Sequence, residues 1–250
     1  MTPLKVTHEI DGMRRSTLPP CAPTDDFHDP AEVADFLAKI GVNADTGLSR
    51  DDAMARRTLY GSNRVTPPVN CPSWVCCLLP CLLRTPSMQA YQKALPREAS
   101  VRRLQGNGKT RKLRMDAASL VYGDVVEVKA GDVVSADLRV IECSEDCVVD
   151  QTSLVGGEAD EEDAMEASTS MPRRIKRVTV KPTSTKDLLV SGNVLLMSTK
   201  VIKGSAVGVV IATGDETLWG QLLHHHEWPV SNSKSRAHRG DNDESHALMR

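Results

Sequence analysis

The stretch that decides the fold runs from Leu120 to Glu161 and reads LVYGDVVEVKAGDVVSADLRVIECSEDCVVDQTSLVGGEADE. Most of its apolar residues are β-branched, which favours strands over helices. The pairs Gly123-Asp124 and Gly131-Asp132 divide the apolar runs and suit tight turns. The stretch therefore predicts short strands joined by turns over residues 120–142.

Other parts of the chain carry the same pattern. Residues 101–104 and 111–113, separated by Gly106-Asn107-Gly108, predict a β-hairpin. Further strands are expected over residues 188–196, 200–202 and 205–212. Together these segments predict a compact β-domain, a distorted jelly roll over residues 98–223.

Two helices are predicted ahead of the strands. Asp29 and Pro30 suit the N-cap and first turn of one helix, which ends at Gly41. Ser49 caps a second helix, which ends at Gly61. The second helix is expected to bury Ala53, Ala55 and Leu59.

The order of residues in the strand-rich stretch resembles the actuator domain of cation-transporting, sodium/potassium-pump-like P-type ATPases. That family's pattern is V-x-G-D-L-V-x-V-x-x-G-D-x-x-P-A-D-x-R, then D-Q-S-x-L-T-G-E-S. The matching residues are Val121, Gly123, Asp124, Val126, Val128, Gly131, Asp132, Ala136, Asp137, Arg139, Asp150, Gln151 and Leu154. Residues 191–222 resemble the closing strands of the same domain. The resemblance implies an α+β fold in which an actuator-like distorted β jelly roll carries a small N-terminal helical region.

The helical pair resembles the N-terminal region of the same family, G-L-S-x-x-x-A-x-x-R-x-x-x-Y-G-x-N-x-L-x-x-P. The matching residues are Gly47, Leu48, Ser49, Ala53, Arg56, Tyr60, Gly61, Asn63 and Pro68, with Val65 in the Leu position. The predicted organisation is a disordered leader (1–27), the helical region (28–70), a Cys-rich apolar stub of a lost membrane hairpin (71–86), the β-domain (87–223) and a disordered tail (224–250).

The catalytic loop of the family has a degenerate counterpart here. In the family, the Glu of Thr-Gly-Glu-Ser positions the water that hydrolyses an aspartyl phosphate. This chain reads Val155-Gly156-Gly157-Glu158-Ala159 instead. A gapped alignment keeps Glu158 as the counterpart of that Glu, whereas an ungapped one places Gly157 there. An inserted residue shifts a side chain by about 3 Å, so the geometry that the water requires is in question.

The rest of the family's catalytic machinery has no match. The sequence contains no Asp-Lys-Thr-Gly-Thr, which carries the phosphorylated Asp in the family. Phosphoryl transfer requires an acceptor, a phosphate cradle and magnesium ligands in one place. We therefore expect a truncated, noncatalytic chain that lacks the ATP and Mg²⁺ sites of the family.

The apolar run from Trp74 to Leu83 is ten residues long and contains Pro80. Because crossing a bilayer takes about 20 residues, no full transmembrane helix is expected. The run suits a core or interface segment, or a contact with the membrane surface. Acylation at Cys76, Cys77 or Cys81 is left open.

Composition limits the other partners. A net charge of -2 and an aromatic content of 3% leave no basic field and few stacking platforms, so nucleic acid is not expected. The cysteines lack the paired spacing of structural zinc sites. The histidine run from His224 to His226 suits a transition metal only in a third, least favoured hypothesis.

The first hypothesis for function is a truncated P-type-ATPase-like protein that acts on the cytosolic face of a pump or derives from one. The alternative is a soluble or membrane-peripheral interaction module that reuses the β-fold. Both hypotheses place the protein in the cytoplasm or at a membrane. Whether the two resembling blocks pack together is left open by the sequence.

Overall fold

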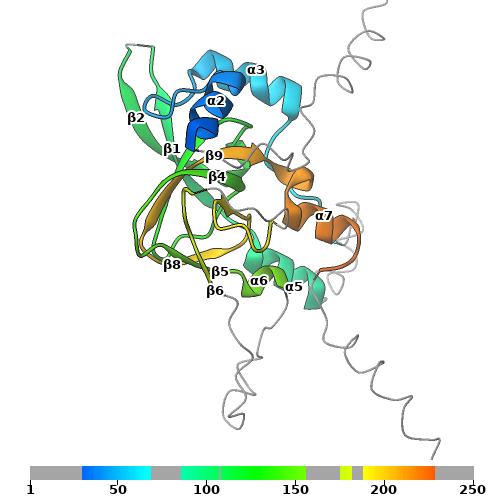
Figure 1. Cartoon of the computed structure of the whole chain (residues 1–250). Coiled ribbons are helices and arrows are strands. Elements are labelled where there is room, and N and C mark those ends of the chain that lie inside the picture. Colours follow the sequence, from blue (N-terminus) through cyan, green and yellow to red (C-terminus); the bar gives the residue numbers. More distant parts are fainter. Residues whose placement is uncertain (1–29, 69–85, 107, 156–174, 182–187, 229–250) are drawn as a thin grey trace, which may run out of the picture.

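The computed structural model describes residues 30–68, 86–106, 108–155, 175–181 and 188–228 (Figure 1). The leader, the apolar run from Trp74 to Leu83, and Gly157 and Glu158 lie outside these ranges. The helices are α2 (Pro30–Ile40), α3 (Arg50–Tyr60), α5 (Pro86–Ala94), α6 (Thr152–Val155) and α7 (Leu218–His224), with 3-10 turns at Ala117–Ser119 and Gly214–Glu216. None of the helices in the described ranges is long and apolar enough to cross a membrane.

Nine strands in the described ranges form two antiparallel sheets. The strands are β1 (Glu98–Leu104), β2 (Thr110–Asp116), β3 (Val125–Lys129), β4 (Asp137–Cys143), β5 (Val148–Asp150), β6 (Ile175–Arg177), β7 (Val194–Leu195), β8 (Lys200–Lys203) and β9 (Ser205–Ala212). The larger sheet has the order β2-β1-β3-β9-β4-β7, and the smaller has the order β6-β5-β8. The predicted α+β class and the actuator-like β-rich domain are confirmed.

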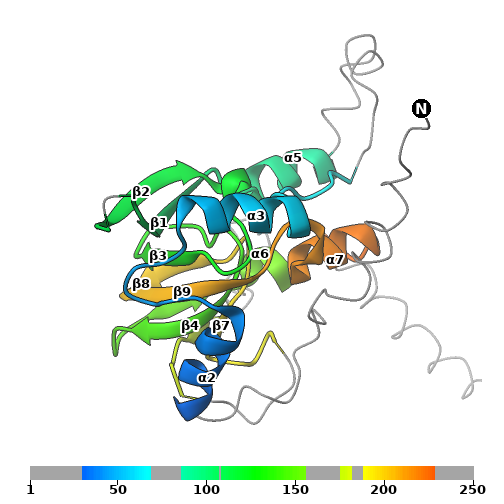
Figure 2. The same cartoon turned by 90° about the horizontal axis from the view of Figure 1, so that it is seen from above.

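The larger sheet is the middle layer of the molecule. Alternation along β3 and β9 sends Val126 and Val210 to one face, where they pack with Val149 and Val201 of the smaller sheet. Val125 and Val209 point to the other face and pack with residues of the helical region. Figures 1 and 2 show α2 and α3 together over that second face.

The α2–α3 connection is bound directly to strand β1. The Leu104 backbone N–H donates to the Leu48 carbonyl at 3.0 Å, which extends the sheet by one parallel bridge. Gly47 allows this approach, because it has a φ of +68° and a Cβ there would lie 1.9 Å from the Arg102 carbonyl oxygen. The two blocks that resemble the family therefore pack against each other.

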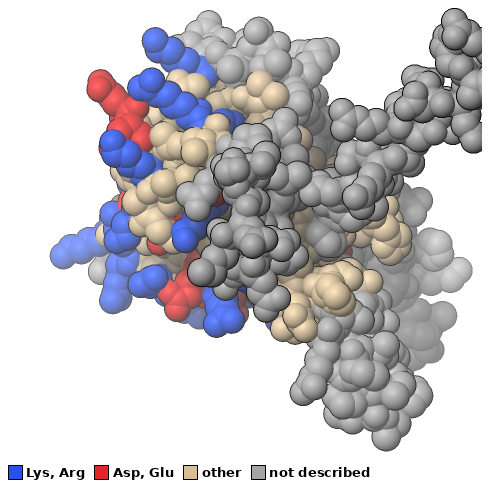
Figure 3. Space-filling view, turned by 90° about the horizontal axis from the view of Figure 1, so that it is seen from below, with Lys and Arg blue, Asp and Glu red and all other residues tan. Residues whose placement is uncertain are grey.

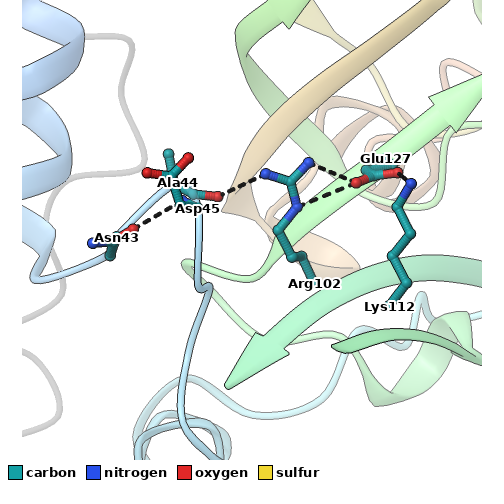
Figure 4. A network of polar contacts seen from close by, with 6 residues as sticks. All are labelled: Asn43, Ala44, Asp45, Arg102, Lys112 and Glu127. Atoms are coloured by element: carbon teal, nitrogen blue, oxygen red, sulfur yellow. Dashed lines mark hydrogen bonds and ion pairs between the residues drawn. The ribbon is translucent and has the colours of Figure 1, made fainter. Parts of the chain in front are cut away.

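Arg102 links the same connection to β3 (Figure 4). Its Nη1 donates to the Ala44 carbonyl at 3.2 Å, and its Nη2 donates to Glu127 Oε1 at 2.6 Å. Lys112 forms a second ion pair with Glu127. Burial alone would raise the pKa of Glu127, but hydrogen bonds from Lys112 and Arg102 bring it below the ordinary value.

Helix α3 buries a different face from the one expected. Ala53 is buried as predicted, whereas Ala55 and Leu59 are exposed. The reason is Arg56, one turn beyond Ala53, which points inward and donates to the Ile40 and Tyr122 carbonyls at 2.5 and 3.2 Å. The buried face thus contains a guanidinium that a count of apolar residues misses.

Two boundaries of the β-domain also differ from the sequence expectation. Of residues 188–196, only Val194 and Leu195 are in a strand, and the Ser191 carbonyl ahead of that strand accepts from the Lys176 ammonium. At the other end, residues 224–228, which were expected in a disordered tail, are described and ordered in α7 and the turn after it. Trp228 is 7% exposed and packs edge-on against Trp219, so residues 224–228 belong to the domain.

Asn63 joins four parts of the chain from a buried position. Its Nδ2 donates to the Ala117 and Ser135 carbonyls at 2.9 and 2.7 Å, and its Oδ1 accepts from the Gly214 backbone N–H at 2.8 Å. The residue is 3% exposed, so its amide would be costly to bury without these partners.

We predict that Asn63→Asp lowers the free energy of unfolding by about 3 kcal/mol at pH 7, because the carboxylate cannot donate to two buried carbonyls. The loss should shrink at acid pH, where a protonated carboxyl regains one donor. The control is Asn43→Asp: Asn43 Oδ1 only accepts, from the backbone N–H groups of Asp45 and Thr46, so a carboxylate can replace it. Urea denaturation of both variants measures the difference, and equal losses would contradict the prediction.

Candidate functional site

The candidate site is the segment that contains Gly157 and Glu158, and the structure describes the residues on both sides of this segment. One end leaves α6 at Val155, and the other enters β6 at Ile175. Strands β5 and β6 pair side by side, with Asp150 opposite Ile175. The two ends are therefore held together at one place, here called the loop base (residues 150–154 and 175–176).

The first turn of the loop base is fixed by its own side chains. Asp150 Oδ1 accepts from the Thr152 backbone N–H at 2.9 Å and from the Thr152 hydroxyl, which forms an Asx turn at the start of α6. Ser153 Oγ donates to the Ser198 carbonyl at 2.7 Å. Ser198 presents that carbonyl from a left-handed conformation with a φ of +72°, uncommon for a residue other than glycine.

A cluster of aromatic residues packs next to α6. Trp228 Nε1 donates to the Ser153 carbonyl at 2.7 Å, and the fully buried Leu154 packs in the same cluster. Trp219 lies between Trp228 and Tyr91, with ring centroids 5.5 and 5.4 Å away. Trp228, which was expected to lie in a tail, is thus part of the support for the loop base.

Lys176 closes the loop base from the β6 side. Its buried ammonium donates to the Ser191 and Val194 carbonyls at 2.9 and 2.8 Å, with a longer contact to the Leu188 carbonyl. In the amide orientation that suits its neighbours, Gln151 accepts from Lys176 Nζ at 2.9 Å. Lys176 therefore ties β6 both to the 188–194 segment and to the residue that precedes α6.

Asp137 links this region to α7. Its two carboxylate oxygens accept from the backbone N–H groups of Met197 and Leu218, at 2.7 and 2.8 Å. Burial raises the pKa of Asp137 to about 6, although both N–H donors and the charge of Lys176 oppose that rise.

The described residues of the site hold the loop base in place. Within the described ranges, no group of three His, Cys, Asp or Glu side chains could hold a metal ion. His224 and His225 make an edge-on ring contact on the α7 end, and Cys143 and Cys147 are free thiols. The stub cysteines, including Cys76, Cys77 and Cys81, lie outside the described residues.

Sequence reasoning placed the candidate residues Gly157 and Glu158 in a segment outside the described residues, and it missed the residues that hold the loop base. Trp228 carried one signal, since it is a tryptophan in an otherwise polar run. Lys176 carried none, because it sits in a basic run (Arg173, Arg174, Lys176 and Arg177) that suits solvated surface.

Two packed sheets, an Asx turn at the start of α6 and a docked N-terminal helical pair are the features to compare with known protein families. Residues 93–227, more than half of the chain, match the P-type ATPase actuator domain, and the chain belongs to this family. Among its relatives, the sodium/potassium-transporting ATPase subunit alpha-3 of Gallus gallus is 38% identical over 136 residues, covering 54% of this chain and 11% of that protein.

Two further relatives extend the comparison. The potassium-transporting ATPase alpha chain 2 of Cavia porcellus is 35% identical over 135 residues, again 54% of this chain and 11% of the relative. The sodium/potassium-transporting ATPase subunit alpha-4 of Rattus norvegicus is 28% identical over 244 residues, 75% of this chain and 22% of the relative. The chain thus matches only part of these pumps, as expected for a truncated P-type-ATPase-like protein.

We predict a pH dependence of stability from Asp137. Its pKa is about 6 in the fold and near 3.8 when unfolded, so the carboxyl favours folding below pH 3.8 and this contribution is lost as pH rises through 6. The expected loss is about 3 kcal/mol at most. The difference in unfolding free energy between the wild type and Asp137→Asn, measured from pH 4 to 7.5, isolates it. A difference that stays constant with pH would contradict the assignment.

We predict that Trp228→Phe loosens the loop base by about 1–2 kcal/mol, because it leaves the Ser153 carbonyl without its donor. Hydrogen exchange of the amides of residues 152–155 should quicken accordingly. Trp219→Phe is the matched control. It removes the same ring volume but keeps the Ser153 bond, and the Trp219 Nε1 has no partner to lose among the described residues. Equal local exchange in both variants would refute the role of the bond.

Proposed function

We propose that this chain is a noncatalytic actuator-domain module that acts on the cytosolic face of a P-type cation pump. One observation carries the proposal: the helical region and the actuator sheets form a single unit. Arg56, Asn63 and Arg102 bind that region to the β-domain through contacts between residues 58 to 151 positions apart. Because the helical region and the β-domain hold each other in place, the chain can dock on a partner as one rigid module.

The chain's own residues argue against an independent catalytic cycle. No Asp-Lys-Thr-Gly-Thr occurs among the 250 residues, so the module has no acceptor of the family's kind for a phosphoryl group. We therefore expect no phosphoenzyme from the isolated chain and no requirement for ATP or Mg²⁺. The pump on which the module docks would supply the phosphorylated Asp.

The loop sequence suggests binding without the family's hydrolytic step. Glu158 lies three residues beyond Val155, at which α6 ends, and the doubled glycine before it raises the conformational entropy that a fixed pose must overcome. The proposed activity is therefore association with a pump, with Gly157 and Glu158 in a degenerate loop.

The test combines binding and turnover on membranes that contain a sodium/potassium pump. We expect the chain to co-purify with the pump and to leave its dephosphorylation rate the same for the wild type and Glu158→Gln. A separate incubation of the chain alone with labelled ATP tests whether it can phosphorylate itself. It should give no acid-stable, hydroxylamine-sensitive product. Absence of co-purification would refute the module. A slower dephosphorylation with Glu158→Gln would instead show a working loop.

A further inference from the structure

Strand β2 forms one edge of the six-stranded sheet, far from the loop base (Figure 1). All seven of its residues pair with β1, from Asp116 opposite Glu98 to Thr110 opposite Leu104, without a shift in register. Within the described ranges no strand pairs with its other side. A regular edge strand of this length presents a row of backbone N–H and C=O groups to solvent.

The edge is strongly basic. Lys109 precedes the strand, and Arg111, Lys112 and Arg114 lie within it, all exposed. Lys112 pairs with Glu127, and Arg114 pairs with Glu98. In the view from below, Lys and Arg side chains gather along the side on which Figure 1 places β2 and β8 (Figure 3).

Arg111 differs from its two basic neighbours on the strand. It has no carboxylate partner in the described part of the chain, and it lies opposite Arg103, whose guanidinium is already bound to Asp124 at 2.7 and 2.9 Å. A carboxylate placed beside β2 could therefore form an ion pair with Arg111.

These charges select between possible partners. A second copy of β2 would place cations opposite cations, and like charges directly opposite one another in a sheet are destabilising. An acidic strand would meet opposite charges and could use the open backbone groups at the same time.

We propose that β2 takes an acidic, extended peptide segment of a partner protein as an added strand. Side chains of Arg111 lie on one face of the sheet, and those of Lys112 and Arg114 lie on the other. An antiparallel partner would need acidic residues opposite all three, which gives the order acid-x-acid-acid along the peptide. This surface is separate from the loop and does not depend on the proposed association with a pump.

The experiment uses the full chain and a fluorescent eight-residue peptide with glutamates in the order acid-x-acid-acid between valines and threonines. Fluorescence anisotropy gives its affinity, and isotope-edited infrared spectra show whether the bound peptide is a strand. A peptide of the same charge with alternate backbone nitrogens methylated is the control for strand pairing. We expect the unmethylated peptide to bind as a strand and the methylated one to lose binding.

Two substitutions make the same change of charge at different places. Arg111→Glu should weaken peptide binding about tenfold. Lys129→Glu, on an exposed residue of β3 without an ion pair among the described residues, should change it less than about twofold. Circular dichroism checks that both variants fold.

Several results would overturn the proposal. Equal weakening by the two substitutions, or unchanged binding of the methylated peptide, would show charge attraction without an added strand. Self-association of the chain in sedimentation, abolished by Arg111→Glu, would identify a second copy as the occupant. Binding to phosphatidylserine vesicles that depends on Arg111, with no peptide binding, would identify a lipid surface.

Discussion

The three hydrogen bonds of Asn63 are the constraint on which the arrangement of this protein depends. The residue follows α3, yet its amide satisfies carbonyls at Ala117 and Ser135 and an N–H at Gly214. An amide is the side chain that offers two donors and an acceptor without a charge. The N-terminal helices therefore have one position relative to the sheets, and the contacts of Arg56 and Arg102 follow from that position.

The same position sets the support for the loop. Beyond Asn63, the Val65 carbonyl accepts from the Tyr91 hydroxyl at 2.7 Å, and Tyr91 stacks on Trp219. Trp219 contacts Trp228, which holds the Ser153 carbonyl. Burial, with a smaller effect of Asp215, raises the pKa of Tyr91, so its hydroxyl stays a donor. A continuous series of packed groups thus joins the helical region to α6.

Much of the fold was predictable because its signals are local. Valine alternation and Gly-Asp turns gave β3 and β9 (Ser205–Ala212), and Ser49 and Gly61 gave both ends of α3. The sequence could not predict the buried positions of Arg56, Lys176 and Trp228. Each of these side chains is held by carbonyls or aromatic rings that are distant in sequence. For the site, the prediction of Glu158 rests on the sequence alone, and the sequence carried no signal for what holds Asp150–Leu154 in place.

Pairing of Asp150 with Ile175 has a consequence for how this family diversifies. Because the β5–β6 ladder fixes both ends of the segment, a change in the length between them adds a closure cost of only about 0.6 kcal/mol for each doubling. The hydrogen bonds that fix Asp150 and Ile175 do not depend on which residues stand at positions 157 and 158. The anchors of the motif and the motif itself can therefore change independently.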